Sequence, residues 1–189
     1  LRTRGNMRNP RDSFCSYCGT EFLRPLRYPR KCQNPGCGAE TYANPIPVAL
    51  LLLPVLHKER MGLLVVRRAI EPQLGKLALV GGFVEEYETW QQGAAREAKE
   101  EAGVTVDPNT LAPYFFSSTE PRPNRVLLFA LGQPISSASL PSFVPNHEVS
   151  ERGLIFGTQG LAPLFAFHLH LLASARPSRG LAVTWQCSA

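Results

Sequence analysis

Aliphatic residues gather into short runs along the middle of the chain, and these runs predict the strands of a sheet. The segments VALLLLPV (48–55) and GLLVVRR (62–68) have the length and branched aliphatic content of buried strands, and a third run, LALVGG (77–82), leads into a turn. Residues 113–132 predict two further strands around the Pro-rich loop SSTEPRPN. The Pro- and Ser-rich stretch at 133–146 predicts a loop or linker.

The segment that follows the third run predicts a turn, a helix and a second turn. Gly81 and Gly82 permit backbone angles that other residues resist. Glu88 or Thr89 can cap the start of the helix, and Gly103 is placed to end it in the left-handed conformation.

The C-terminal part carries weaker signals. Residues 161–175 predict another helix, on which His168 and His170 lie two positions apart and face different ways. We therefore expect structural roles for both histidines rather than a shared metal. Cys187, alone in the tail, is expected to be an incidental thiol.

Three carboxylates lie on one side of the predicted central helix. Residues three and four apart share a helix face, so Glu97, Glu100 and Glu101 project together. Such crowding of like charge destabilises an isolated helix by ~0.2 to 0.5 kcal/mol per pair, and a divalent cation would remove the penalty. Hard oxygen ligands suit Mg²⁺ or Mn²⁺. Taken alone, the eight residues REAKEEAG would more often form a solvated face with an ordinary Arg96–Glu100 pair.

The residues around the helix favour a functional interpretation. The segment GFVEEYETWQQGAAREAKEEAGV has seven regularly spaced positions: Gly82, Glu88, Arg96, Glu97, Glu100, Glu101 and Gly103. This pattern resembles the Nudix box of the nucleoside diphosphate-X pyrophosphohydrolases. The resemblance implies an α/β fold, an α/β/α sandwich built on a mixed sheet, and hydrolysis of a pyrophosphate linkage by water. Val80 and Tyr87 stand where the family often has Pro and Gly.

The resemblance also implies roles for individual residues. The expected magnesium ligands are Glu97 and Glu101, assisted by Glu100 and the Gly81 carbonyl. Arg96 would orient the glutamates by bidentate pairing, and Glu88 completes the expected catalytic set. The general base stays open among four residues: Glu97, Glu100, Glu148 and Glu151.

Four cysteines near the N-terminus predict a structural metal site. Cys15, Cys18, Cys32 and Cys37 have the spacing C-x2-C-x13-C-x4-C, which looks like a zinc ribbon. Four thiolates leave no open coordination position, so the Zn²⁺ is expected to be structural. The alternatives are two disulfides or free thiols. No apolar signal segment precedes the cysteines, which favours a reducing cytoplasm.

A zinc ribbon followed by a Nudix box resembles two groups of the family: bacterial NADH pyrophosphatases, and pyrophosphatases that act on FAD and ADP-ribose. The NADH group carries an S-Q-P-W-P-F-P-x-S array, which this chain lacks, whereas RRAIEP (67–72) and HEVSERGLIF (147–156) are similar to the second group. The candidate substrate-binding residues are Arg67, Arg122, Arg125, Glu148 and Glu151. Phe115 or Phe116 could stack on a base, although paired aromatic residues in a strand usually belong to a core.

Length and charge bound the remaining possibilities. A chain of 189 residues accommodates one standard domain and a small module. The expected parts are a basic arm (1–13), the ribbon (14–43), the Nudix domain (44–176) and a tail (177–189). No apolar run is long enough to cross a bilayer, so a soluble cytoplasmic protein is expected, and a homodimer remains open.

The excess positive charge lies at the N-terminal end. Residues 1–47 hold eight basic and three acidic residues, whereas 48–189 hold twelve of each. The basic residues of the ribbon, Arg24, Arg27, Arg30 and Lys31, could meet nucleic acid phosphates, although a solvated face is the commoner role. The alternatives to a FAD or ADP-ribose pyrophosphatase are an NADH pyrophosphatase, an enzyme that removes RNA caps, and a non-enzymatic nucleotide sensor.

Overall fold

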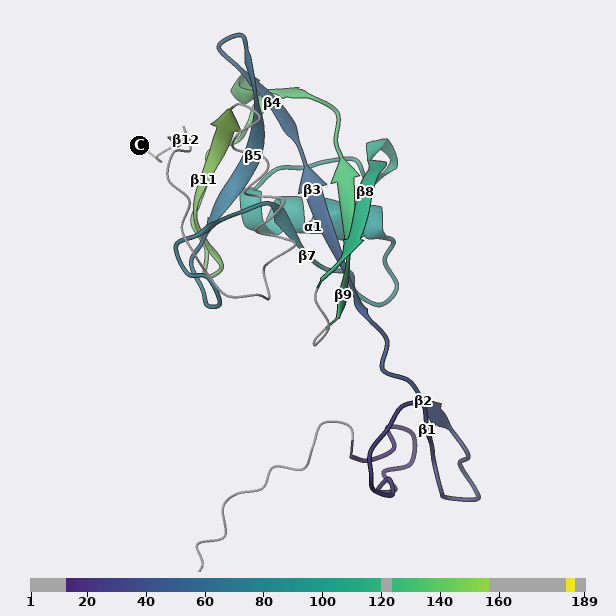
Figure 1. The fold of residues 1–189 in the computed structure, drawn as a ribbon. Coiled ribbons are helices and arrows are strands. Elements are labelled where there is room, and N and C mark those ends of the chain that lie inside the picture. The colour runs from purple at the N-terminus through teal and green to yellow at the C-terminus, as the bar shows by residue number, and fades with distance from the viewer. Residues whose placement is uncertain (1–12, 120–123, 157–182, 186–189) are drawn as a thin grey trace, which may run out of the picture. The chain divides into compact units, whose positions relative to one another are not determined.

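A computed structural model describes residues 13–119, 124–156 and 183–185 of the chain (Figure 1). The chain divides into two compact units, residues 1–44 and residues 45–189. Each unit has its own buried apolar cluster, and each is described below by itself.

The first unit is a small two-stranded module built around its cysteines. Strands β1 (Arg30–Lys31) and β2 (Glu40–Thr41) pair in antiparallel register. Cys15, Phe22 and Cys32 form the buried centre, against which Leu26, Cys37 and Ala39 pack. So few apolar residues form only a small core, and modules of this size usually need a metal or disulfides to fold.

The second unit contains two sheets. The four-stranded sheet has the order β7 (Val80–Phe83), β3 (Ile46–Leu52), β9 (Arg125–Leu131), β8 (Ala112–Ser118). The other sheet has the order β10 (Ile135–Ser136), β4 (Pro54–His57), β5 (Arg60–Arg68), β11 (Val149–Phe156), β12 (Val183–Trp185), and β6 (Leu77–Ala78) also pairs with β5. Both sheets are mixed, because β3 and β9 run parallel, as do β10 and β4, while the other pairs are antiparallel.

Two apolar runs contribute to both sheets, so the prediction of one strand over 48–55 is wrong, as is that of a turn at Gly81 and Gly82, which lie within β7. The run 48–55 divides at Leu53 into β3 and β4, and the run 77–82 divides at Leu79 into β6 and β7. Leu53 and Leu79 are fully buried, so the chain crosses between the sheets inside the core. A continuous apolar run cannot reveal such a crossing, since both halves are equally hydrophobic.

Helix α1 (Trp90–Ala102) confirms the predicted helix at both ends. Thr89 is the N-cap residue, and its side chain and that of Gln92 form a reciprocal capping box. Gly103 ends the helix in the left-handed conformation at φ 68°. The short 3₁₀ helices η1 (Pro108–Thr110) and η2 (Ser137–Ser139) lie in the connections.

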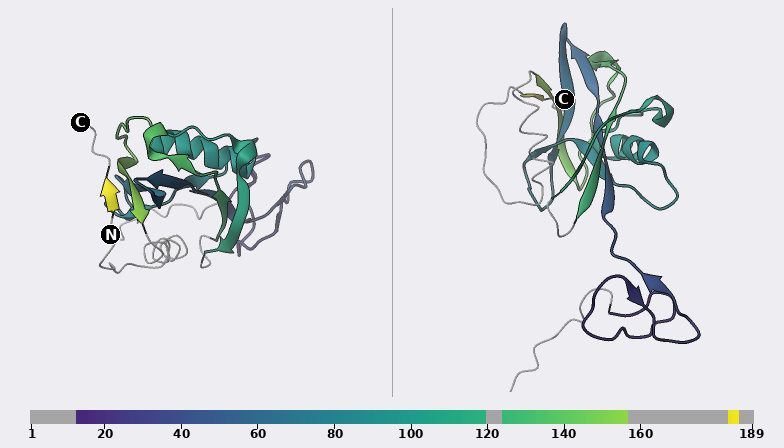
Figure 2. Two further views of the ribbon diagram at one scale, coloured as in Figure 1. Left: turned by 90° about the horizontal axis from the view of Figure 1, so that it is seen from above. Right: turned by 45° about the vertical axis from the view of Figure 1, so that its right-hand side comes forward.

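Helix α1 covers one face of the four-stranded sheet (Figure 2). Its small buried residues Ala94, Ala98 and Ala102 let the helix approach closely, and they belong to the same apolar cluster as Ala49 and Leu51 of β3. The alternate residues of the strands point to the opposite face and form a second cluster. The predicted helix over 161–175, with His168 and His170, lies outside the described residues, as do Arg122 and Cys187.

Candidate functional site

The close approach of β7 to α1 creates the candidate active site. A Cβ added at Gly82 would lie 2.2 Å from Glu97 Oε1, and one added at Gly81 would lie 2.2 Å from the Ala49 carbonyl oxygen. Only glycine therefore fits at either position without a shift of its neighbours. Gly82 therefore lets Glu97 lie directly against the backbone of β7, and Gly81 lets β7 lie close to the backbone of β3.

Glu101 is the most deeply placed of these glutamates. Its Oε2 accepts a hydrogen bond of 2.9 Å from the Gly81 amide, and its side chain is buried. Burial raises the pKa of Glu101 to about 8, and the neighbouring charges of Glu97 and Glu148 act in the same direction. A bound cation would therefore stabilise the ionised form of this carboxyl group.

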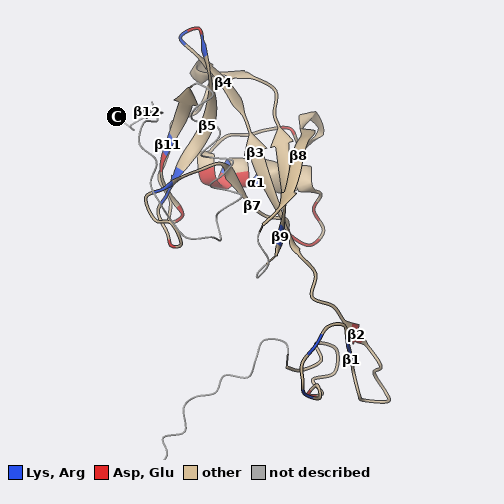
Figure 3. Ribbon diagram, in the orientation of Figure 1, with Lys and Arg blue, Asp and Glu red and all other residues tan. Residues whose placement is uncertain are grey.

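Glu97 is the second buried carboxylate of the site. Burial raises its pKa, and Arg96 opposes that shift while Glu100 and Glu148 add to it. Glu148 precedes β11 and therefore brings a carboxylate from the other sheet close to Glu97 and Glu101. The acidic residues gather on α1 as Figure 3 shows.

Arg96 holds the carboxylates in place. Its guanidinium donates to Glu88 (2.9 Å), Glu97 (2.9 Å) and Glu100 (2.9 Å). It also donates to the Phe83 carbonyl oxygen at 2.9 Å. A planar guanidinium can satisfy several acceptors at fixed angles, so Arg96 orients the glutamates as a group.

Glu88 anchors the loop that precedes the helix. It accepts hydrogen bonds from Arg96 and from the Glu85 amide, and the bond from Arg96 is the main cause of its lowered pKa. Tyr87, directly before it, adopts a left-handed backbone at φ 73° with its side chain 97 % exposed. The loop therefore keeps the conformation that a glycine would favour, at a cost of ~1 to 2 kcal/mol for a non-glycine residue.

The chemistry of this donor set fits a divalent cation of the magnesium type. Glu97 and Glu101 are buried carboxylates whose ionised forms are destabilised by burial and by mutual repulsion. Hard oxygen ligands of this kind hold Mg²⁺ or Mn²⁺, usually together with substrate phosphates. The assignment of Glu97, Glu100, Glu101 and the Gly81 carbonyl as ligands stays a prediction.

The two arginines at the end of β5 have different surroundings. Arg67, a predicted substrate-binding residue, donates through Nε to Glu151 at 2.7 Å and through Nη1 to the Gly75 carbonyl at 2.8 Å. Arg68 lies near enough to Glu101 to lower its pKa, and its Nε donates to the Pro72 carbonyl. The structure thus places Arg68 beside the carboxylates, while Arg67 and Glu151 engage one another.

The predicted substrate-binding residues of β8 and β9 lie on the four-stranded sheet. Arg125 begins β9 and lies over the Phe83 ring, with its guanidinium carbon 5.4 Å from the ring centroid. Phe115 is 49 % exposed and Phe116 is 74 % exposed, so the interpretation of this pair as core residues is wrong for both. Both lie on β8, an edge strand, where side chains have a neighbouring strand on one side alone.

Two residues that sequence reasoning missed fasten the C-terminal end of α1. Arg152 of β11 is 1 % exposed, and its Nη1 donates to the Ala102 carbonyl oxygen at 2.6 Å. Asn146 donates through Nδ2 to the Glu100 carbonyl oxygen at 2.8 Å. Both bonds satisfy carbonyls that the helix leaves without internal partners. The available signal was an arginine directly before the apolar end of β11, residues 153–156.

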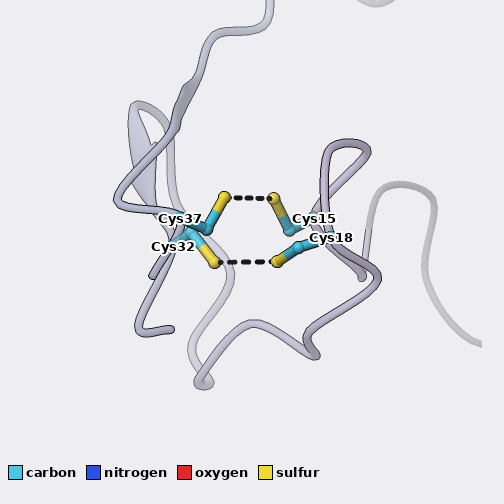
Figure 4. Close-up of side chains that lie close together, drawn as sticks. All are labelled: Cys15, Cys18, Cys32 and Cys37. Carbon is cyan, nitrogen blue, oxygen red and sulfur yellow. Dashed lines mark hydrogen bonds between the residues drawn. The ribbon is translucent and has the colours of Figure 1, made fainter. Parts of the chain in front are cut away.

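The four cysteines of the first unit converge on one point (Figure 4). Their Sγ atoms all lie within 4.8 Å of one another, with Cys15 and Cys37 3.8 Å apart and Cys18 and Cys32 3.5 Å apart. Bonds of ~2.3 Å to a central Zn²⁺ put tetrahedral sulfurs ~3.8 Å apart, whereas a disulfide requires ~2.05 Å. The cluster therefore fits zinc, and these four thiols are not paired as disulfides. A hydrogen bond with Thr20 lowers the pKa of Cys18 to about 6, which favours the metal-binding thiolate.

The described part of the chain contains no candidate for a membrane-spanning segment. Within residues 13–119, 124–156 and 183–185, α1 and the two 3₁₀ helices lack the length and apolar character that a spanning helix requires.

Solved structures with the same fold include a NUDIX hydrolase and a NUDIX domain with bound ADP ribose. A NUDIX hydrolase from Nitrosomonas europaea is 32% identical, with a TM-score of 0.55 and coverage of 78% of both chains. The NUDIX domain of Shewanella oneidensis NrtR, solved with ADP ribose, is 18% identical, with a TM-score of 0.53 and coverage of 65% of this chain and 79% of that one. At 18% identity the NrtR likeness shows the fold alone.

A curated relative and a family model indicate the same family as the solved structures. The NAD-capped RNA hydrolase NudC of Pseudomonas aeruginosa is 29% identical over 170 residues, which cover 87% of this chain and 56% of NudC. The chain thus spans about half the length of its curated relatives. The NUDIX domain model matches residues 46–155, a range that contains the two sheets' main strands, α1 and the whole glutamate cluster. The chain therefore belongs to the Nudix hydrolase family.

Proposed function

We propose that the chain hydrolyses the pyrophosphate linkage of a nucleoside diphosphate joined to another group, with Mg²⁺ or Mn²⁺. The observation that carries this proposal is the buried pair Glu97 and Glu101 against the backbone of β7. Burial raises the pKa of both carboxyl groups, and a bound cation would favour their ionised forms. A divalent ion bound there would neutralise phosphate charge and lower the pKa of an attacking water.

In the proposed reaction, water attacks one phosphorus of the pyrophosphate and the bridging oxygen leaves with the other phosphate. The proton of the attacking water must pass to a base. Glu97 and Glu100 accept hydrogen bonds from Arg96, and Glu151 accepts one from Arg67, so these three carboxylates already have an arginine partner. Glu148 contacts the exposed His147 at 3.2 Å and lies close to both buried carboxylates, so it is our preferred base.

For the substrate we propose a dinucleotide or nucleotide sugar of the FAD or ADP-ribose type. The loop between β8 and β9 lacks the array that accompanies NADH pyrophosphatases. Arg68 acts on the pKa of Glu101, and Arg125 lies over the ring of Phe83, whose carbonyl oxygen accepts from Arg96, so both arginines are candidates to supply positive charge to a diphosphate.

A second candidate substrate is the capped 5′ end of an RNA. The relative from Pseudomonas aeruginosa carries the name NAD-capped RNA hydrolase, and residues 1–47 of this chain hold eight basic residues against three acidic ones. A basic segment is able to bind RNA phosphates beyond the cap.

A single assay separates these candidates. The kcat/KM values for FAD, ADP-ribose, NADH and an NAD-capped RNA oligonucleotide would be measured side by side with Mg²⁺ and with Mn²⁺. We expect FAD or ADP-ribose to lead, with AMP as one product and ¹⁸O from labelled water in a product phosphate. A lead of tenfold or more by NADH or RNA would replace the substrate assignment. Absence of hydrolysis of every compound would overturn the proposed reaction.

The same assay tests the base. We expect Glu148→Gln to lower kcat by about two orders of magnitude or more and to leave KM nearly unchanged. Glu151→Gln is the matched control, because Glu151 lies three residues further along the chain, in β11, and is paired with Arg67. If Glu151→Gln has the larger effect on kcat, the assignment of Glu148 is wrong.

A further inference from the structure

The Asn146 side chain makes hydrogen bonds to two segments that carry acidic residues of the site. Its Nδ2 donates to the Glu100 carbonyl oxygen, near the C-terminal end of α1, at 2.8 Å. Its Oδ1 accepts from the Glu148 amide and from the Val149 amide at 2.8 Å each. One planar side chain thus joins the backbone of α1 to the backbone that carries Glu148.

The backbone around Glu148 is also held by two bonds that do not involve side chains. The Asn146 amide donates to the Val149 carbonyl oxygen at 2.9 Å, and the Glu148 carbonyl oxygen accepts from the Ala69 amide at 2.7 Å. Directly after this segment, the register of β11 against β5 shifts between Val149 and Glu151. Such a bulge interrupts the regular ladder and re-aims side chains. The conformation at Glu148 therefore depends on the Asn146 turn and not on continuous strand pairing alone.

The position of Glu148 relative to α1 matters for the reaction. Its charge acts on Glu97 and Glu101, so its carboxylate lies near both. These two residues and Glu100 belong to the last two turns of α1, and the bond from Asn146 reaches the residue directly before Glu101. A general base must lie within hydrogen-bond reach of the water that it deprotonates. A misplacement of about 1 Å at a reacting centre can cost ~100-fold in rate.

We propose that Asn146 is a positioning residue, which fixes the distance between the Glu148 carboxylate and the cation-binding carboxylates of α1. This assignment rests on the proposed function, in which Glu148 is the base. Asn146 is exposed, so water can replace its hydrogen bonds when the side chain is removed. Its removal should therefore change the geometry of the reaction more than the stability of the fold.

The test is a double-mutant cycle between Asn146 and Glu148. Asn146→Ala removes the side-chain bonds, and Asn146→Ser keeps a hydroxyl that can accept from the Glu148 amide but is too short to reach Glu100. We expect each to lower kcat, for ADP-ribose or the panel compound hydrolysed fastest with Mg²⁺, by roughly 10- to 100-fold, with KM within about 2-fold. In a Glu148→Gln background, Asn146→Ala should change kcat by no more than about 2-fold, because the group that it positions is already lost. Asn109→Ala is the control, since Asn109 is another exposed asparagine and its side chain binds Asp107; its kcat should be unchanged.

The outcomes separate positioning from a structural role. A loss of kcat from Asn146→Ala that is equally large with and without Glu148→Gln would overturn the proposal, because Asn146 would then not act through Glu148. Wild-type kcat in Asn146→Ala would overturn it as well, and wild-type kcat in Asn146→Ser would show that the bond to Glu100 is not needed and so would overturn the link to α1. The proposed function is judged separately, by hydrolysis in the parent chain and its loss in Glu101→Gln. Thermal unfolding of each variant verifies that it is folded.

Discussion

Glu101 Oε2 accepts a hydrogen bond of 2.9 Å from the Gly81 amide, which joins the last turn of α1 to the edge strand β7. The bond holds a buried carboxylate where neither a lysine nor an arginine forms an ion pair with it at short range within the described residues. The hydrogen bond from the Gly81 amide and the more weakly acting charge of Arg68 lower the pKa of Glu101 and so offset part of the effect of burial. Glu101 is therefore the residue whose replacement is most informative.

Replacing Glu101 or Glu97 by glutamine should abolish most of the activity. The neutral amide keeps the shape of the side chain but removes the charge that a divalent cation requires. We expect Glu101→Gln and Glu97→Gln each to lower kcat/KM by about three orders of magnitude or more, with the unfolding temperature unchanged or raised. Glu86→Gln, an exposed position in the loop before α1, is the control. Near wild-type turnover in both variants would refute the metal-ligand assignment.

Without added divalent cations, the stability of the Nudix unit should fall as the pH rises from about 6 to about 8. The folded protein keeps a proton on Glu101, whose pKa is about 8, while the unfolded chain has released it above its ordinary value of 4.5. The unfolded state thus binds fewer protons in this window, and stability decreases with pH.

Mg²⁺ should reverse this trend, because it binds the ionised carboxylates and its stabilising effect therefore grows with pH. Thermal unfolding at pH 6, 7 and 8 with and without Mg²⁺ measures both effects. Glu101→Gln should flatten the dependence. A Mg²⁺-induced rise in Tm that is larger at pH 6 than at pH 8 would contradict the assignment.

The cysteine cluster should hold one Zn²⁺ per chain. Structural zinc supplies ~10 to 16 kcal/mol to a small module, far more than the core of Cys15, Phe22 and Cys32 could provide. We expect Cys18→Ser to unfold residues 14–43, detected by limited proteolysis, and to leave the unfolding transition of the Nudix unit in place. Cys187→Ser is the matched control. Elemental analysis that finds no zinc in the purified protein would refute the prediction.

Replacing Arg152 by alanine should destabilise the Nudix unit by about 3 kcal/mol, because the Ala102 and Pro141 carbonyls lose their donors in a buried place. Urea unfolding measures the change. Arg67→Ala is the control, since Arg67 forms a partly exposed ion pair with Glu151 that is expected to contribute no more than ~1 kcal/mol. Equal losses of unfolding free energy in the two variants would show that the hydrogen bonds of Arg152 do not stabilise the C-terminal end of α1.

The local sequence was sufficient to predict helix α1 and the cluster of four cysteines. Thr89 and Gly103 predicted the two ends of α1 because capping depends on the residues at the end itself. Glu97, Glu100 and Glu101 were predicted to share a side from helical spacing, and the cysteine spacing predicted a cluster that the four Sγ atoms form. In each case the interacting groups are close in sequence, or a motif with few alternatives specifies them.

Contacts between distant segments could be decided only by the tertiary structure. Three features show this: the division of 48–55 between two sheets, the Arg67–Glu151 ion pair, and the hydrogen bond from Arg152 to the Ala102 carbonyl. In each case the sequence alone is compatible with other strand boundaries or other partners. Between Arg67 and Arg68, strand alternation says that the two face opposite ways, but not which one meets Glu101. Such choices follow from strand register and from packing against β11 and α1, which are properties of the assembled core rather than of any one segment.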